Sequence, residues 1–186
     1  HLAKFSIALL AALRGSLCIY QGEELGLPES DVAFEDLTDP YGIRFWPAYK
    51  GRDGCRTPMV WEADAPNGGF TTGTPWLPIS NADLAVDQGG PVLDAYRKML
   101  AFRADHPAIQ QGSISFLPEA GEVLAFTRET EEETLLFVFN LGRKATSWPL
   151  PEGMAAGANL IPEFSASADN TEVNLTGLDA YCARLK

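Results

Sequence analysis

Apolar residues at the start of the chain recur with the spacing of an α-helix. They lie three or four positions apart, at Leu2, Phe5, Leu9 and Leu13. The opposite side of this helix is apolar as well, and a helix that is apolar nearly all round belongs inside a larger protein. Gly15 ends it, and the apolar run of residues 16–20 has the pattern of a fully buried parallel strand. Helix, buried strand and polar loop in this order are the α-to-β step of a (β/α) barrel.

Regular periodicity then disappears from residue 27 to about residue 86, a stretch rich in proline and glycine. A loop of this length is rare in compact domains and is usually functional where it occurs. Three of the four tryptophans, Trp46, Trp61 and Trp76, lie in this stretch. Because such a composition can bury apolar surface, we expect the loop to be packed rather than disordered.

The remainder of the chain predicts one helix and then a series of strands. Gly90-Pro91 begins the helix, with proline at the first helical position, and His106-Pro107 ends it. Short strands are expected at residues 112–117, 123–128, 134–140, 145–148, 159–161, 172–175 and 180–185. Regularly spaced short strands with turn residues between them indicate an antiparallel sandwich. We therefore divide the chain into two domains, residues 1–107 and residues 108–186.

The composition excludes several classes of function. The chain has 186 residues, of which 46% are hydrophobic and 21% are charged, as in ordinary globular proteins. Its net charge of −11 argues against nucleic acid and anionic membranes as partners and fits a neutral ligand such as a sugar. The opening apolar run is too short to span a bilayer. Three widely spaced cysteines suggest free thiols in a reducing cytoplasm, and no residue pattern indicates a metal or another cofactor.

The loop Tyr20-Gln21-Gly22-Glu23-Glu24 follows the predicted strand, where the binding groups of a barrel gather. Retaining glycosidases place two carboxyl groups about 5 Å apart across the scissile bond. Adjacent residues of one loop cannot face each other across a sugar, so the two glutamates are not a catalytic pair. They either cap backbone N–H groups and pair with arginines, or they accept hydrogen bonds from a substrate. On the second interpretation, Tyr20 and Glu23 are candidate substrate-binding residues.

The segment Arg52-Asp53-Gly54-Cys55-Arg56-Thr57-Pro58 is a sharper signal. A guanidinium can donate to two sugar hydroxyls at once, or to a carboxylate that binds the sugar. A structural pair that holds the loop is the simpler explanation for Arg52 and Asp53. The tryptophans of the loop offer flat faces for a sugar ring, although core packing is the commoner role of such residues.

Together these motifs resemble the carboxyl-terminal part of α-glucosidases of the α-amylase superfamily, of the oligo-1,6-glucosidase type. The motifs are IYQGEELG at residues 19–26 and KGRDGCRTPMVW at residues 50–61, with further similar segments at residues 39–47, 69–78 and 96–108. The resemblance implies the last portion of a (β/α)8 TIM barrel, followed by an antiparallel β-sandwich.

The resemblance also implies a role for one arginine and the absence of the catalytic groups. In that family the arginine of the Arg-Thr-Pro-Met segment, which is Arg56 here, lines the subsite for the non-reducing glucose. The catalytic carboxylates of the family precede the helix that begins at Leu2, so the chain offers no catalytic candidate. The expected parent is a retaining hydrolase of α-linked gluco-oligosaccharides. The chain, which lacks an initiator methionine, is expected to be a truncated piece that is inactive alone.

Two other interpretations remain open. The chain is either part of a trehalose synthase or isomaltulose synthase type of enzyme, which shares these loops, or a stand-alone sugar-binding module. If it is part of a barrel, the side chains that faced the missing strands lose their partners, and we expect the isolated chain to self-associate. These side chains are Leu2, Phe5, Leu9 and Ile19.

Overall fold

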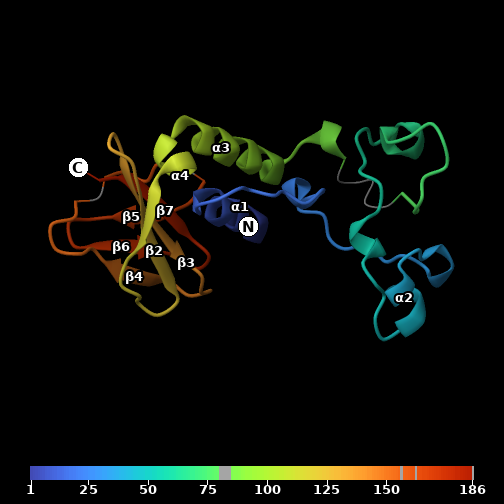
Figure 1. Cartoon of the computed structure of the whole chain (residues 1–186), viewed down its shortest axis with the longest axis horizontal. Helices are drawn as coiled ribbons and strands as arrows, with labels where there is room; N and C mark the ends of the chain where they lie inside the picture. The colour runs from blue at the N-terminus through green and yellow to red at the C-terminus, as the bar shows by residue number, and fades with distance from the viewer. Residues whose placement is uncertain (80–84, 156, 162, 186) are drawn as a thin grey trace. The chain divides into compact units, whose positions relative to one another are not determined.

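The computed structural model describes residues 1–79, 85–155, 157–161 and 163–185, and the chain divides into two compact units. Residues 1–18 and 95–186 form the first, which we call the sandwich unit, and residues 19–94 form the second, which we call the loop unit. Figure 1 shows strands and helices in the first and mostly irregular backbone in the second. The domain boundary predicted near residue 107 rests on the change of sequence pattern there, and it stays a prediction.

Three helices belong wholly or largely to the sandwich unit. Helix α1 spans Leu2–Ala12, as the apolar spacing predicted. Helix α3 spans Pro91–Asp105 and also begins and ends where it was expected. A short helix, α4, spans Pro107–Gln111 and was not expected. Pro107 ends α3 but is also the first helical residue of α4, because the N–H that proline lacks is not needed there. Among the described helices, none is both long enough and apolar enough to cross a bilayer.

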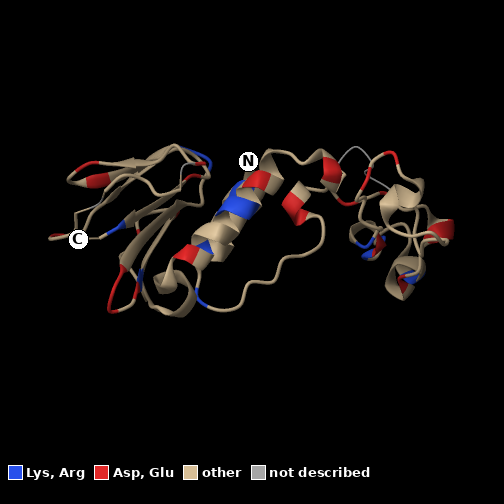
Figure 2. Ribbon diagram, turned by 90° about the horizontal axis from the view of Figure 1, so that it is seen from above, with Lys and Arg blue, Asp and Glu red and all other residues tan. Residues whose placement is uncertain are grey.

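The strands form two antiparallel sheets, which confirms the predicted antiparallel arrangement (Figure 1). One sheet has the order β1-β2-β3-β7, with strands Ser113–Phe116, Val123–Glu129, Thr134–Asn140 and Ala180–Arg184. The other has the order β4-β6-β5, with strands Thr146–Pro149, Glu172–Leu175 and Ser167–Ala168. Figure 2 shows that most strand residues are uncharged, whereas α3 carries a band of charged residues. Strands β2, β3 and β7 are buried along nearly their whole length, which is why they carry few charges.

The two faces of the larger sheet have different partners. Residues of one face pack against the smaller sheet around the buried Trp148. On the opposite face the rings of Phe126, Phe137 and Phe139 are stacked, with centroids 5.4–6.2 Å apart. Helix α1 covers this face, and its Phe5 meets Phe139 edge-on at 5.9 Å. The expectation that Phe5 lacks a partner is therefore wrong, since its side chain is only 4% exposed.

Residues 159–161, which were predicted as a strand, form none. The side chain of Asn159 accepts hydrogen bonds from the backbone N–H groups of Ile161 and Cys182 and donates to the carbonyl oxygens of Ala166 and Ala180. The side chain of Asn159 thus binds backbone groups that would pair with a neighbouring strand if this segment were a strand.

Residues 16–20, which were predicted as a buried parallel strand, also form none. Ile19 is 37% exposed and Tyr20 is 50% exposed. A parallel strand forms within a sheet that is covered on both faces, and neither of the two described sheets includes this segment. The prediction fails in this chain because no strand pairs with the segment.

The loop unit consists of short turns and one short helix, as the loss of periodicity indicated. Helix α2 spans Pro40–Phe45, and its first turn is capped by the side chain of Asp39, which accepts a hydrogen bond from the N–H of Tyr41. An aspartate before a proline at the first helical position is a helix-start signal. Among the described residues of this unit, short 3-10 segments lie at Glu23–Leu25, Phe34–Asp36, Asp53–Cys55, Pro66–Gly69 and Val86–Gln88.

Two small apolar clusters support the described part of the loop unit. One consists of Leu25, Met59 and Leu93, and a second of Val32, Leu37 and Leu77. The expectation that its tryptophans are core residues holds only in part. Trp46 packs against the second cluster, whereas Trp61 is 49% exposed and Trp76 is 58% exposed.

Candidate functional site

A buried carboxylate fixes the turn that carries the Arg-Thr-Pro segment. Asp53 is fully buried. It accepts hydrogen bonds from the backbone N–H groups of Thr38 and Asp39, at 2.6 and 2.7 Å, and from the Thr38 hydroxyl at 3.1 Å. Because a buried carboxylate is costly unless it is hydrogen-bonded, these three donors stabilise the approach of residues 38–39 to the turn.

Asp39 is the second anchor of this turn. Its carboxylate is buried and accepts hydrogen bonds from the backbone N–H groups of Tyr41 and Arg52, at 2.9 and 3.0 Å. These N–H groups, together with the guanidinium groups of Arg52 and Arg56, hold the pKa of Asp39 below its usual value. Arg52 therefore pairs with Asp39, and the predicted pairing of Arg52 with Asp53 is corrected.

Two glycines allow the backbone to pack closely around these carboxylates. At Gly54 a Cβ atom would lie 2.4 Å from the carbonyl oxygen of Ser30, so no larger residue fits. Gly51 has a φ of +78°, and a Cβ there would lie 3.0 Å from the carboxyl carbon of Asp39. The glycines of the motif are thus required by close approach and by a left-handed backbone conformation.

Arg56 lies at the end of this turn with part of its side chain free. One terminal nitrogen lies 3.7 Å from Oδ1 of Asp53 and 3.9 Å from Oδ2 of Asp39. These separations are longer than hydrogen bonds, and the side chain is 39% exposed. The two aspartates therefore attract and orient the guanidinium while leaving donors available to a ligand.

The loop that follows residue 19 lies beside the same turn. The Tyr20 hydroxyl lies 3.9 Å from Sγ of Cys55, and the Gln21 amide donates to the carbonyl oxygen of Thr57 at 3.0 Å. Desolvation of the hydroxyl and its contact with Cys55 raise the pKa of Tyr20, so it remains a hydrogen-bond donor at neutral pH. The two motifs found separately in the sequence thus lie side by side.

Tyr20, Gln21 and Arg56 line a cavity of about 450 Å³, and Trp76 completes its wall. The indole N–H of Trp76 donates to the carbonyl oxygen of Arg56 at 3.1 Å. The sequence offered no signal that distinguishes Trp76 from the other tryptophans of the loop, because only the fold determines which of them reaches Arg56.

Glu23, the third predicted residue, lines a neighbouring cavity of about 120 Å³ together with Tyr20 and Cys55. Its Oε1 atom is buried and has no hydrogen-bond partner among the described residues. Glu24, in contrast, accepts a hydrogen bond from the N–H of Gly22 at 2.8 Å, which is the capping role that was one of the two interpretations. Tyr20 borders both cavities and so connects Glu23 with Arg56.

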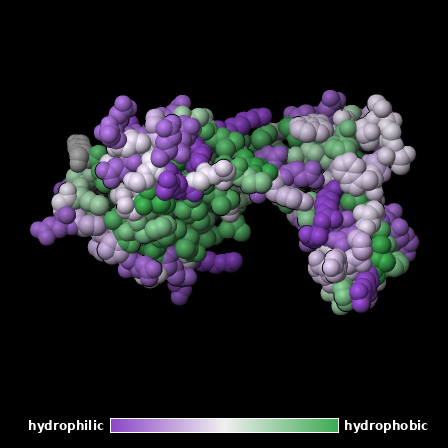
Figure 3. Space-filling model, viewed as in Figure 1, coloured by the Kyte–Doolittle hydropathy of each residue, from purple (hydrophilic) through white to green (hydrophobic). Residues whose placement is uncertain are grey.

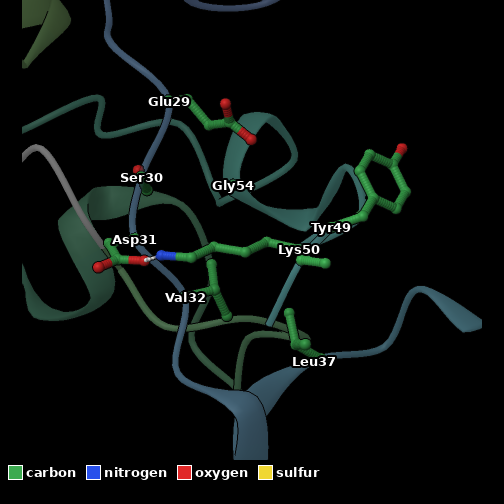
Figure 4. A pocket seen from close by; sticks show the side chains of 10 residues that line it. Glu29, Ser30, Asp31, Val32, Leu37, Tyr49, Lys50 and Gly54 are labelled. Atoms are coloured by element: carbon green, nitrogen blue, oxygen red, sulfur yellow. Dashed lines mark hydrogen bonds and ion pairs between the residues drawn. The ribbon is translucent and has the colours of Figure 1, made fainter. Parts of the chain in front are cut away.

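A further cavity of about 450 Å³ lies in the loop unit, and Figure 4 shows its lining. Lys50 forms an ion pair with Asp31 across it, and Tyr49 lies at its rim. None of the three predicted site residues lines this cavity. It shares Glu29 and Gly54 with the smaller cavity beside Glu23.

The arrangement around Arg56 is suited to binding. It combines cationic and hydroxyl donors with a carboxylate acceptor, whereas the carboxylates of Asp39 and Asp53 are occupied by backbone donors. Within the part of the chain that the structure describes, no group of three His, Cys, Asp or Glu residues is placed to hold a metal ion. A polar concave site of this kind fits a neutral hydroxylated ligand.

Family models and curated proteins match most of the chain. A model described as the alpha amylase catalytic domain matches residues 1–112, and one described as the maltogenic amylase C-terminal domain matches residues 114–181. A probable alpha-glucosidase of Rhizobium meliloti (strain 1021) is 51% identical over 189 residues, which cover 98% of this chain and 34% of that protein. An oligo-1,6-glucosidase of Heyndrickxia coagulans is 31% identical over 178 residues, which cover 81% of this chain and 31% of that protein. The chain thus spans about a third of the length of these relatives.

Solved structures give the same result. The crystal structure of an alpha-glucosyl transfer enzyme, XgtA, is similar with a TM-score of 0.85 and 45% identity, over 99% of this chain and 35% of that one. The trehalulose synthase MutB from Pseudomonas mesoacidophila MX-45 is similar with a TM-score of 0.79 and 28% identity, over 99% of this chain and 38% of that one.

Proposed function

The chain belongs to the α-amylase family, as the end of its catalytic domain followed by its C-terminal β domain, and on this basis we propose that the protein of which it forms part hydrolyses terminal α-glucosidic bonds of oligosaccharides. The observation that carries the proposal is the cavity in which Arg56 and Tyr20 meet. The probable alpha-glucosidase from Rhizobium meliloti, at 51% identity, supports it.

In this proposal the described residues bind the substrate. Arg56 donates to hydroxyl groups of the non-reducing glucose, with its guanidinium oriented by Asp39 and Asp53. Tyr20 donates a further hydrogen bond, and Glu23 accepts one through the oxygen that lacks a partner among the described residues. A neutral sugar fits a protein with a net charge of −11 better than an anionic ligand does.

Catalysis requires groups that this site does not offer. A retaining mechanism needs a nucleophilic carboxylate and an acid/base carboxylate about 5 Å apart, and the family resemblance places these in the part of the relatives that the chain does not span. We therefore expect the chain to supply substrate contacts and its β domain, and to hydrolyse no glucoside alone.

A chimeric enzyme tests the proposal. The matching third of the Rhizobium meliloti relative is replaced with this chain, and hydrolysis of p-nitrophenyl α-glucoside is measured. We expect turnover by the chimera, none by the chain alone, and a loss of at least about 100-fold in kcat/KM for Arg56→Ala. A chimera that melts cooperatively but does not turn over, or hydrolysis by the chain alone, would contradict the proposal.

A second candidate function is glucosyl transfer or sucrose isomerisation. It is favoured by the structural similarity to an alpha-glucosyl transfer enzyme and to a trehalulose synthase. Product analysis with maltose and with sucrose separates the candidates. A hydrolase converts maltose completely to glucose. A transferase releases one glucose and passes the other glucosyl unit to an acceptor sugar, and an isomerase converts sucrose to a new disaccharide. A third candidate, a stand-alone sugar-binding module, would require tight sugar binding by the chain alone, which calorimetry measures.

We also propose a cytoplasmic protein whose isolated chain self-associates. Cys18, Cys55 and Cys182 are free thiols, as is usual in a reducing compartment. Leu2 is 61% exposed, and Figure 3 shows apolar residues gathered on the visible face of the sandwich unit. Light scattering of the purified chain is expected to show species larger than the 20.2 kDa monomer. A single monomeric species would contradict this part of the proposal.

A further inference from the structure

The indole of Trp76 lies at the surface of the loop unit. It is 58% exposed and forms part of the cavity lined by Tyr20, Gln21 and Arg56. A large aromatic side chain in the wall of a polar cavity is a common feature of sites for small ligands. Burial in a core therefore does not account for the position of Trp76.

The ring is held in one orientation from two sides. Its N–H donates to the carbonyl oxygen of Arg56 at 3.1 Å. Phe70 meets the indole edge-on with ring centroids 5.2 Å apart, and Phe70 itself packs on the cluster of Leu25, Met59 and Leu93. A ring fixed in this way loses little further freedom when a ligand packs on it, which favours binding.

The indole and its neighbours complement the two kinds of surface on a sugar. A pyranose presents C–H groups on the faces of its ring and hydroxyl groups around its rim. We propose that Trp76 is the platform on which a C–H face of the α-glucosyl ring packs, while Arg56 and Tyr20 bind its hydroxyl groups. The proposal rests on the proposed function for the identity of its ligand, but its test measures binding by this chain and not turnover.

Trp61 is a matched control within the same unit. It is 49% exposed, close to the value for Trp76. It lies outside the cavity that contains Arg56, and its backbone N–H donates to the carbonyl oxygen of Gly68 at 2.8 Å. A non-specific affinity of exposed indoles for sugar would affect Trp61 and Trp76 alike.

The first experiment follows the four indole N–H resonances of the full chain by heteronuclear NMR during titration with isomaltose and with maltose. The Trp76→Phe spectrum assigns the Trp76 resonance by its loss. We expect the Trp76 resonance to move progressively, with an affinity on the order of millimolar, while the Trp61 resonance stays in place. A Trp76 resonance that does not move with either sugar, or that moves no more than that of Trp61, would overturn the proposal.

The second experiment compares variants by the saturation transfer from protein to isomaltose. Trp76→Phe keeps a flat ring but loses the N–H donor, so we expect affinity within about threefold of the unsubstituted chain. Trp76→Leu removes the ring and is expected to weaken binding about tenfold. Trp61→Leu is expected to change nothing. Unchanged affinity of Trp76→Leu, with an amide spectrum that shows the fold retained, would exclude the platform role.

The two proposals fail in distinguishable ways. If the chimera hydrolyses α-glucosides but the Trp76 resonance of the chain is unaffected by sugar, the platform role is wrong and the hydrolase stands. If the resonance moves with isomaltose but the folded chimera has no hydrolytic activity, the binding role stands and the proposed reaction is wrong.

Discussion

The sandwich unit and the loop unit hold their backbones in place by different means. In the sandwich unit, alternating apolar side chains fill the space between two sheets, and three stacked phenylalanines, Phe126, Phe137 and Phe139, lie beneath helix α1. In the loop unit, two buried carboxylates, Asp39 and Asp53, bind backbone N–H groups and bring distant segments together. Apolar packing produces a core, whereas carboxylate anchoring leaves polar groups at a surface.

This difference explains why the candidate site lies in the loop unit. At Arg56, buried carboxylates attract one nitrogen of the guanidinium, and part of the side chain stays exposed. In the sandwich unit the corresponding cation is satisfied internally. Arg128 is fully buried and donates to the carbonyl oxygens of Ala12, Gly112 and Ser113. An arginine buried in this way fixes structure and is not accessible to a ligand.

The largest expected effect follows from opening the apolar core. Phe137→Ala removes one fully buried ring of the stack, and we expect it to lower the free energy of unfolding of the sandwich unit by about 3–5 kcal/mol. Urea denaturation followed by the indole N–H resonance of the buried Trp148 measures this loss. The exposed Phe116, replaced by alanine, is the control and is expected to cost less than about 1 kcal/mol. Equal costs for the two variants would contradict the description of this core.

The next effect tests the polar anchor of the loop unit. Asp53→Asn keeps the shape of the side chain but has one acceptor oxygen in place of two, so at least one of its three donors loses its partner. We expect the turn to be destabilised by about 2–3 kcal/mol. Faster hydrogen exchange at the amides of Thr38 and Asp39 reports the loss. Asp36→Asn, at an exposed position of the same unit, is the control, and exchange equally fast in both variants would refute the anchoring role.

Arg128→Met would show how far the sandwich unit also depends on polar anchoring. The substitution leaves the carbonyl oxygens of Ala12, Gly112 and Ser113 without this donor, and we expect a cost of about 2 kcal/mol. Thermal unfolding of the variant measures it. Burial lowers the pKa of Arg128, so part of the lost interaction is offset by relief of the desolvation of this cation. A variant as stable as the unsubstituted chain would mean that apolar packing alone maintains the unit.

A smaller, pH-dependent effect is expected at Glu133. Burial by itself raises its pKa, but hydrogen bonds from His106, at 2.8 Å, and from Arg184 outweigh burial and lower the pKa overall. A carboxyl whose pKa is lowered on folding stabilises the protein above its unfolded pKa, about 4.3, and that contribution disappears as the pH falls through the folded value.

Glu133→Gln is therefore expected to cost about 1 kcal/mol at neutral pH, since Arg184 is mostly exposed and solvent screens this partner. The difference between the variant and the unsubstituted chain should shrink below about pH 4. Unfolding curves across this range measure it, with Glu132→Gln as the exposed control. If the stability difference between Glu133→Gln and the unsubstituted chain grew as the pH fell, the pKa of Glu133 would not be lowered on folding.

The smallest expected effect concerns the reactivity of the three cysteine thiols, which reports how well each is buried. Burial raises the pKa of Cys182, which lies in strand β7, whereas Cys18 and Cys55 are exposed. A thiol reagent is therefore expected to modify Cys18 and Cys55 in the folded chain and Cys182 only after unfolding. Rapid modification of all three without denaturant would mean that the sandwich unit opens far more readily than its packing implies.

Much of the fold could be predicted from the sequence. The apolar spacing predicted α1, the Gly90-Pro91 pair predicted the start of α3, and the short alternating segments predicted strands in an antiparallel arrangement. The family and fold class implied by the motifs are confirmed by the matching family models. These features follow from local patterns of period 2 or 3.6, which neighbouring residues specify by themselves.

The predictions that failed all depended on a distant partner. Residues 16–20 have the composition of a buried strand, but a strand exists only where another strand supplies its hydrogen bonds. Residues 159–161 form no strand, because the side chain of Asn159 binds the backbone groups of Ala180 and Cys182. Phe5, expected to lack a partner, meets Phe139 across 134 positions of chain.

By itself, the sequence determined most of the helices and strands, their order and the family, and it named the residues that we propose bind a sugar. Only the tertiary structure decided that Arg56 pairs with Asp39 and Asp53, that Tyr20 lies beside Cys55, and that Trp76 rather than Trp61 lines the cavity. The physical reason is that contacts between loops depend on close approach of backbones. Glycines and buried carboxylates permit that approach, but no periodic pattern records which segments they join.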